Sequence, residues 1–281
     1  MSGMNIPKIP LGDWVEAFED WLGEHFQPVF DGIKLVIGSI VGALEWVFDA
    51  TPALLLIAII SLLAYWLGRW RIGLFTLAGL LLIWNLELWD KTMQTLALVL
   101  TSGFISIVIG IPIGILCAQS RSVQNVLTPV LDFMQTMPAF VYLIPAVSFF
   151  SLGVVPGVIA SVIFAIPPTI RLTNLGIRQV PAELVEASDA FGSTRMQKLF
   201  KLQLPLAVPT IMAGVNQTIM LSLSMVVIAS MIGAQGVGAD VYRAITQVKT
   251  GVGFEAGLAV VILAIVLDRL THKIIQRNRR D

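Results

Sequence analysis

Few residues in this chain have the types and spacing that covalent chemistry requires. Neither His25 nor His272 has a set of cysteine, histidine or carboxylate neighbours at metal-ligand spacing. The sequence contains no Gly-x-x-x-x-Gly-Lys-Ser/Thr phosphate loop and no Gly-x-Ser-x-Gly nucleophile turn. The single cysteine, Cys117, can form no internal disulfide, and its apolar neighbours indicate a buried thiol. We therefore expect no catalytic residue, metal or cofactor on this chain.

One polar stretch is a candidate for binding another protein. Pro181 suits the first turn of a helix, and Glu183 complements the positive end of its dipole. Gly192 suits a left-handed cap that ends this helix, and Thr194 and Gln197 are spaced as a capping box for a second helix. Leu204-Pro205 is expected to stop that second helix. The resulting helical elbow is either an ordered connecting loop or a docking element for a soluble protein.

Composition places most of the chain in lipid. Hydrophobic residues make up 56% of the 281 residues and charged residues 13%, and the mean hydropathy is +0.85. Soluble domains carry about 25% charged residues. Because there is too little polar side-chain material to coat a water-soluble globule, we predict an all-α membrane protein. The net charge of zero implies no nucleic-acid partner.

Seven apolar segments come near the ~20 residues that a transmembrane helix needs. They are 53–68, 72–89, 95–118, 128–150, 154–171, 206–231 and 254–269. Glycine and proline interrupt several of them, which fits pathway-lining helices or ordinary kinks from close packing. We therefore expect a polytopic bundle of about seven transmembrane helices.

Two segments before these, 13–26 and 31–48, have the apolar spacing of amphipathic helices. Their polar faces are acidic, so packing on the bundle or on a partner is favoured over binding to anionic lipid. No cleavable signal peptide is evident, and we expect the chain to enter the membrane through its own first spans.

Lysine and arginine concentrate on the cytoplasmic side of membrane proteins, which predicts an orientation. If the 172–205 loop is cytoplasmic, thirteen of the 18 basic residues fall inside, and so does the C-terminus. The five outside are Lys8, Lys34, Lys91, Arg243 and Lys249. Residues 1–51 then lie outside, unless 31–48 spans and moves the N-terminus inside.

The polar elbow resembles the EAA loop of bacterial ABC-importer permeases: Glu-Ala-Ala, three residues, Gly, nine residues, Ile-x-Leu-Pro. Five positions match in register, while Ser188 replaces the second alanine and Leu202 the isoleucine. The resemblance implies that the elbow is a coupling helix that inserts into a groove on an ATP-hydrolysing subunit. The residues implied to couple to the ATPase are Glu183, Glu186, Ala187, Ser188, Gly192, Leu204 and Pro205.

A wider resemblance covers roughly residues 90–270. Residues 132–142, 167–171, 214–217 and 224–227 are similar to permeases for glycine betaine, proline betaine, carnitine and choline, which serve osmoprotection. This implies the permease subunit of an ATP-driven importer in the cell membrane, with a type I core of five helices plus accessory N-terminal helices. The implied assembly is a homodimer with one pathway, two ATP-binding cassette subunits that carry ATP and Mg²⁺, and an extracytoplasmic substrate-binding protein.

These expectations divide the chain into four parts: amphipathic helices at 1–51, two accessory transmembrane helices at 52–92, a core permease domain at 93–271 that includes the coupling loop, and a basic cytoplasmic tail at 272–281.

The implied translocation path draws on polar and aromatic residues of the core. A quaternary ammonium has no N–H to donate, so aromatic faces attract it by ~0.5–2 kcal/mol each. Importers of this type resemble one another in placing the high-affinity cage on the external protein, which leaves the permease a weak, wet path. An alternative for Asp132 is a solvated carboxylate near a helix start. The candidates are Asp132, Gln135, Thr136, Met137, Phe140, Tyr142, Asn216, Gln217 and Ser224.

Two other classes of transporter are alternatives. An ion-coupled secondary transporter or channel for a small osmolyte would need charge pairs or an ion site within its spans, which hold almost no charge. An exporter permease of the same superfamily would have much longer cytoplasmic helices than this elbow allows.

Overall fold

The computed structural model describes residues 10–68 and 70–277, and all regular secondary structure in these ranges is helical. Of the predicted tail at 272–281, residues 272–277 belong to the last helix, whereas 278–281 lie outside the described residues, as do Lys8 and Arg69. The helical class expected from the sequence is confirmed.

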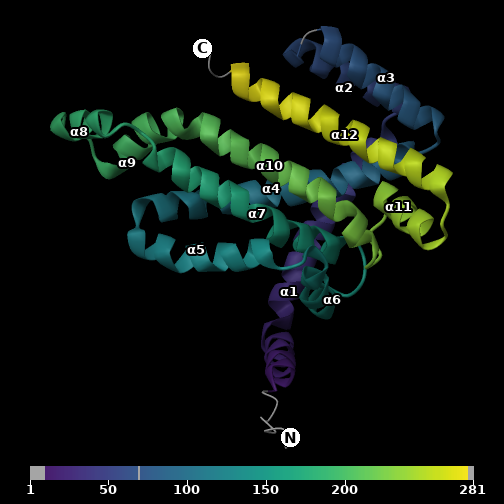
Figure 1. Ribbon diagram of the computed structural model, residues 1–281, viewed down its shortest axis with the longest axis horizontal. Coiled ribbons are helices and arrows are strands. Elements are labelled where there is room, and N and C mark those ends of the chain that lie inside the picture. The colour runs from purple at the N-terminus through teal and green to yellow at the C-terminus, as the bar shows by residue number, and fades with distance from the viewer. Residues whose placement is uncertain (1–9, 69, 278–281) are drawn as a thin grey trace, which may run out of the picture.

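Three long helices form the centre of the bundle: α4 (Trp89–Gln119), α7 (Val154–Arg178) and α10 (Leu204–Ser230). Helix α7 packs along both α4 and α10 (Figure 1). Gly114 makes the approach of α4 to α7 possible, since a Cβ there would lie 2.5 Å from Cβ of Thr173 and 2.7 Å from the Ile170 carbonyl oxygen. Gly214 of α10 similarly lies against the Pro168 carbonyl of α7. At these two positions the glycines in the spans serve close helix packing.

The remaining helices surround this centre. Helix α12 (Thr250–Arg277) packs against α10, and the short α11 (Val237–Thr246) joins the two at one end of the bundle. Helices α2 (Ala53–Gly68) and α3 (Trp70–Asn85) form a hairpin against α12, at the upper right of Figure 1. The elbow of α8 (Ala182–Ala190) and α9 (Arg195–Lys198) lies at the opposite end of the bundle from α11 (Figure 1).

The described residues contain fewer clear candidate spans than the seven apolar segments of the sequence suggested. Four helices are long and apolar enough to cross a membrane, or up to six if each bent helix pair is one span. Helices α2 and α3 have 16 residues each, which rise only about 24 Å against a hydrocarbon core of ~30 Å. These two helices are therefore shorter than an ordinary transmembrane helix.

The segment 128–150 is not one straight span, as the sequence suggested. Helix α5 (Arg121–Thr136) and the short turn and helix over 139–150 meet at an angle of 108°. Met137 precedes Pro138 and has an extended backbone, with ψ of 138°. A proline disfavours the helical conformation of the residue before it, and this local effect places the break.

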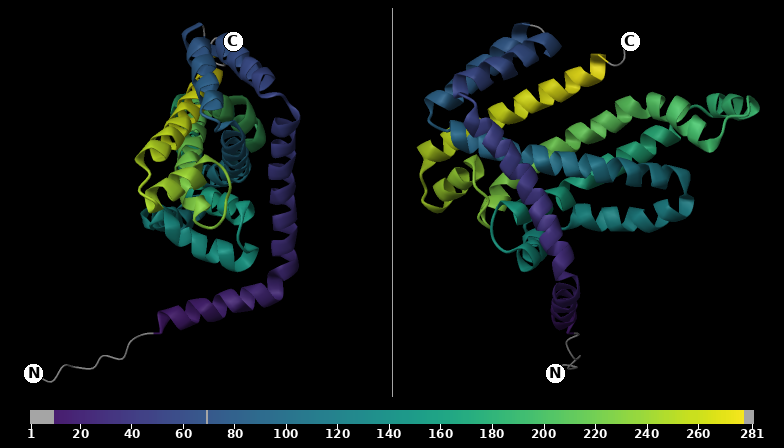
Figure 2. Two further views of the ribbon diagram at one scale, coloured as in Figure 1. Left: turned by 90° about the vertical axis from the view of Figure 1, so that its right-hand side faces the viewer. Right: turned by 180° about the vertical axis from the view of Figure 1, so that it is seen from behind.

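The two amphipathic segments 13–26 and 31–48 are one helix, α1 (Leu11–Ala50), which corrects the expectation of two. Pro28 lies inside it, and Figure 2 shows that α1 changes direction along its length. Proline removes one backbone donor and commonly bends a helix without ending it. The second half of α1 packs on the bundle through the buried Ile37 and Val41, whereas the first half projects away from it (Figure 2).

Candidate coupling elbow and translocation path

The elbow has the local geometry that the sequence predicted. Helix α8 (Ala182–Ala190) ends in a turn at Gly192, whose φ of +76° is the left-handed conformation that glycine adopts most easily. Helix α9 (Arg195–Lys198) begins with a capping box. The amide of Gln197 donates to Oγ1 of Thr194 at 3.3 Å, and the amide of Thr194 donates to Oε1 of Gln197 at 2.9 Å.

An ion pair closes the elbow. The Lys198 ammonium lies 2.8 Å from both carboxylate oxygens of Asp189, which ties α9 back to α8. The pair is partly exposed, so it contributes to the geometry of the elbow more than to its stability.

The elbow is joined to the bundle without a break, which corrects the expectation that Leu204-Pro205 ends its second helix. After α9 the chain continues through a π-helical turn, Leu199–Gln203, directly into α10. Leu199 is buried against Ile177, Ala207 and Ile211, and this packing holds the turn in place. Residues 172–178 of the expected loop belong to α7. The elbow is therefore continuous with α10 through helical backbone.

Most side chains of the matched motif are accessible. Glu183, Glu186, Ala187 and Pro205 are exposed, whereas Ser188 and Leu204 are half-buried. Phe191 at the tip is 91% exposed, which is unusual for a large aromatic side chain. The motif does not include Phe191. An aromatic residue directly before the cap glycine of a polar loop could nevertheless have been predicted from the sequence as an exposed contact residue.

Within the core, Asp132 of α5 forms an ion pair with Arg171 of α7, with 2.5 Å between Oδ1 and Nη2. Both side chains are partly exposed, by 59% and 38%. Nε of Arg171 is buried and has no hydrogen-bond partner among the described residues. Sequence reasoning proposed Asp132 but not Arg171, because the two are 39 residues apart and only the fold brings them together.

Two of the other path candidates hold helices together. The Tyr142 hydroxyl donates to the carbonyl of Met134 at 2.5 Å, which fixes the bend after α5, and the ring is buried. Nδ2 of Asn216 donates to Asp268 at 2.9 Å, and its Oδ1 accepts from Thr271 at 2.7 Å, both on α12. Met137 packs beside Tyr142 in the same apolar cluster. The role of these residues in transport remains a prediction.

Gln217 and Ser224 lie seven residues apart on α10, two helical turns, and both are exposed. Gln217 stands at the middle of this span. A polar side chain at that depth is costly to expose to lipid, so it indicates a surface covered by protein or water. Gln135, Thr136 and Phe140, at the end of α5 and in the turn after it, are also exposed.

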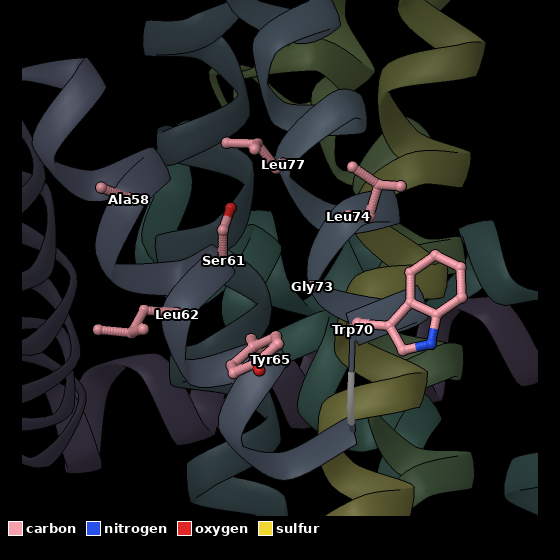
Figure 3. Close-up of a pocket in the computed structure, with 8 residues that line it drawn as sticks. All are labelled: Ala58, Ser61, Leu62, Tyr65, Trp70, Gly73, Leu74 and Leu77. Atoms are coloured by element: carbon pink, nitrogen blue, oxygen red, sulfur yellow. The ribbon is translucent and has the colours of Figure 1, made fainter.

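The structure also contains an apolar cavity of about 510 Å³ between α2 and α3, shown in Figure 3. Leu62, Leu74 and Trp70 line it, with Ser61 and Tyr65 as its polar members. None of the sequence-predicted site residues contributes to it. It lies on the peripheral hairpin, away from the α4–α7–α10 centre.

A family model described as the binding-protein-dependent transport system inner membrane component matches residues 110–280. The glycine betaine transport system permease protein OpuAB of Bacillus subtilis (strain 168) is 58% identical over 96% of this chain and 95% of its own length. The glycine betaine/carnitine transport permease protein GbuB of Listeria monocytogenes is 58% identical over 95% and 96%. The glycine betaine/proline betaine permease protein ProW of Escherichia coli (strain K12) is 49% identical over 96% and 77%.

Solved structures of the MetNI methionine ABC transporter in inward-facing conformations have a similar fold. One of them has a TM-score of 0.62 and 23% sequence identity, and the match covers 68% of this chain and 95% of that one. At this identity the likeness concerns the fold.

Proposed function

The chain belongs to the inner-membrane components of binding-protein-dependent transport systems, and we propose that it is the permease of an ATP-driven importer for glycine betaine or a related quaternary ammonium solute. The observation that carries the choice of substrate is the 58% identity, along nearly the whole of both chains, to two relatives named for glycine betaine. It is a multi-pass membrane protein whose energy comes from a separate ATPase subunit.

The elbow of α8 and α9 is the surface that we assign to the ATPase. Its exposed Phe191 and accessible acidic residues support a protein contact, and its continuity with α10 supports a mechanical connection to the membrane core. The distribution of basic residues supports a cytoplasmic position for the elbow and the C-terminus.

The path would form at the two-fold axis of a homodimer. Two features support this arrangement: the exposed Gln217 in the middle of α10, and the partly exposed pair of Asp132 and Arg171 within the core helices. Ionisable groups at such positions face water or protein rather than lipid. Glycine betaine itself carries one positive and one negative charge, so a water-filled path with paired charges suits it better than an apolar one.

The test is uptake in proteoliposomes that contain this chain with its ATPase, supplied with the substrate-binding protein of the same system. We expect uptake of radiolabelled glycine betaine that requires both ATP and the binding protein. Methionine serves as the control solute and should not accumulate. Uptake by this chain alone, driven by an ion gradient without ATP, would contradict the proposal in favour of secondary transport.

A further inference from the structure

We propose that a basic corner at the end of the bundle opposite the elbow docks an acidic side chain of the substrate-binding protein. The basic corner consists of Lys91, Arg243 and Lys249 around the carboxylate of Asp240, together with Val248 of the adjoining turn. The inference rests on the proposed function, because it assumes an importer with its elbow in the cytoplasm.

Three separate elements build this corner. Lys91 lies in the first turn of α4, Arg243 near the end of α11, and Lys249 in the turn that joins α11 to α12. Figure 1 shows α11 and this turn at the end of the molecule opposite α8 and α9. The residues line a cavity of about 260 Å³, large enough for a carboxylate side chain with water.

The charges within the corner do not balance. Asp240 has only 7% of its side chain exposed, and its carboxylate lies 2.7 Å from the Lys91 ammonium and 3.4 Å from the Arg243 guanidinium. The cavity is lined by three cations and one carboxylate, and Lys249 has no ion pair among the described residues. The nearby Glu87, Asp90 and Glu255 do not line the cavity. Within the cavity lining the cations exceed the carboxylate by two, and Lys249 is the one without an ion pair among the described residues.

This concentration of charge is unexpected on the outer side. Only five basic residues of the chain are predicted to lie outside, and three of them line this one cavity. Membrane proteins place lysine and arginine preferentially on the cytoplasmic side. The Lys91 and Arg243 side chains are 45% and 62% exposed, so an approaching anion can reach them. A cavity lining with an excess of cations is complementary to an acidic side chain of a partner.

The turn beside the cavity favours a protein partner over a lipid headgroup. Val248 has a φ of +54°, a conformation that β-branched residues rarely adopt, and its side chain is 85% exposed. Strained residues of this kind persist where the structure around them holds them, often at binding sites. An apolar side chain presented next to cations is complementary to a protein surface that combines an acidic residue with apolar contacts.

The corner is also rigidly fixed to the helices that lead to the elbow. The amide of Val237 donates to Oγ1 of Thr95 on α4 at 2.9 Å. A Cβ on Gly238 would lie 2.5 Å from the carbonyl oxygen of Val226 on α10, so α11 approaches α10 as closely as only glycine permits. Because α10 continues into the elbow, docking at the corner acts on the same helix that contacts the ATPase.

The experiment uses the complex of this chain with its ATPase in phosphatidylcholine nanodiscs. Soluble binding protein loaded with glycine betaine is titrated, and ATP hydrolysis gives the concentration for half-maximal stimulation. We expect Lys249→Glu to raise that concentration more than tenfold and Lys249→Gln to raise it less. Lys249→Arg, which keeps the charge, and Lys34→Glu, which reverses an exposed charge of α1 outside the corner, should leave it unchanged.

The outcomes separate the two proposals. If the unmodified complex shows no stimulation by the loaded binding protein, the proposed importer function fails, whatever the variants do. If the unmodified complex responds and Lys249→Glu has the same half-maximal concentration, the corner is not the docking surface. An effect of Lys249→Glu that requires added phosphatidylglycerol, and is absent in phosphatidylcholine alone, overturns the inference and assigns the corner to a lipid headgroup.

Discussion

At the scale of single residues, the ion pair of Asp132 and Arg171 is the contact that we propose for the transport path. Both side chains are partly exposed rather than buried in the core. Arg171 lies seven residues before the end of α7, and Asp132 lies four residues before the end of α5. Removing one partner leaves the other charge without its ion pair at the position that we assign to the path.

We expect Asp132→Asn and Arg171→Gln each to lower the initial rate of ATP-dependent uptake on the order of tenfold, which corresponds to about 1.4 kcal/mol. The double variant should recover part of this loss, because it leaves no unpaired charge. Uptake in proteoliposomes measures the rates, with the amount of reconstituted protein as the control. Losses that simply add in the double variant would show that the two residues act independently.

Some residue-scale features could be predicted from the sequence, and others could not. Gly192, Thr194 and Gln197 act through contacts within a few residues, so their spacing was sufficient to predict the cap and the capping box. The pairing of Asp132 with Arg171, and of Asn216 with α12, depends on which helices are neighbours. No local spacing contains that information.

At the scale of elements, the turn at Gly192 decides the shape of the coupling elbow. No atom lies within 4 Å of the position that a Cβ would occupy there, so a side chain meets no obstacle in the free chain. The left-handed backbone itself costs an ordinary residue roughly 1–2 kcal/mol, while asparagine tolerates it. Strain at this turn changes the angle between α8 and α9.

Accordingly, Gly192→Val should lower ATP-dependent uptake more than tenfold while the chain still inserts into the membrane. Gly192→Asn is the matched control and should retain most of the uptake. Co-purification of the ATPase with each variant reports docking separately from transport. Normal uptake by the valine variant would contradict the assignment of the elbow to the contact with the ATPase.

Element boundaries failed where tertiary packing overrode the local signal. Leu204-Pro205 looked like a stop, yet proline is compatible with the first turn of a helix and the buried Leu199 holds the π-helical turn before it. Likewise the two amphipathic segments 13–26 and 31–48 suggested two helices where there is one bent helix with Pro28 inside it. Met137-Pro138 did break its segment, because no tertiary contact among the described residues holds these two residues helical: ψ is 138° at Met137 and 132° at Pro138.

At the scale of the whole molecule, the exposed polar stripe of α10 predicts a contact between two copies of this chain. We expect Gln217→Cys and Ser224→Cys to form dimers with a short bis-maleimide crosslinker in membranes. The only native cysteine, Cys117, is buried, so the background is low. Val261→Cys, on the exposed face of α12, is the matched control and should stay monomeric.

Gel electrophoresis after crosslinking measures the dimer fraction. A complex that transports actively but gives only monomeric bands for both α10 variants would contradict a pathway at the two-fold axis. Equal crosslinking of the α12 control would indicate random collision rather than a defined interface.

The short hairpin of α2 and α3 has a consequence for the membrane itself. A cation–π contact places the Arg71 guanidinium 5.6 Å from the Trp70 ring at one end of the hairpin, residue types that favour the headgroup region. Lipid beside these helices has to thin by several Å to match them, at a cost of fractions of a kcal/mol per Å. We therefore expect bilayers of shorter acyl chains to suit this permease better, so that the thickness of the host membrane contributes to the free energy of its assembled state.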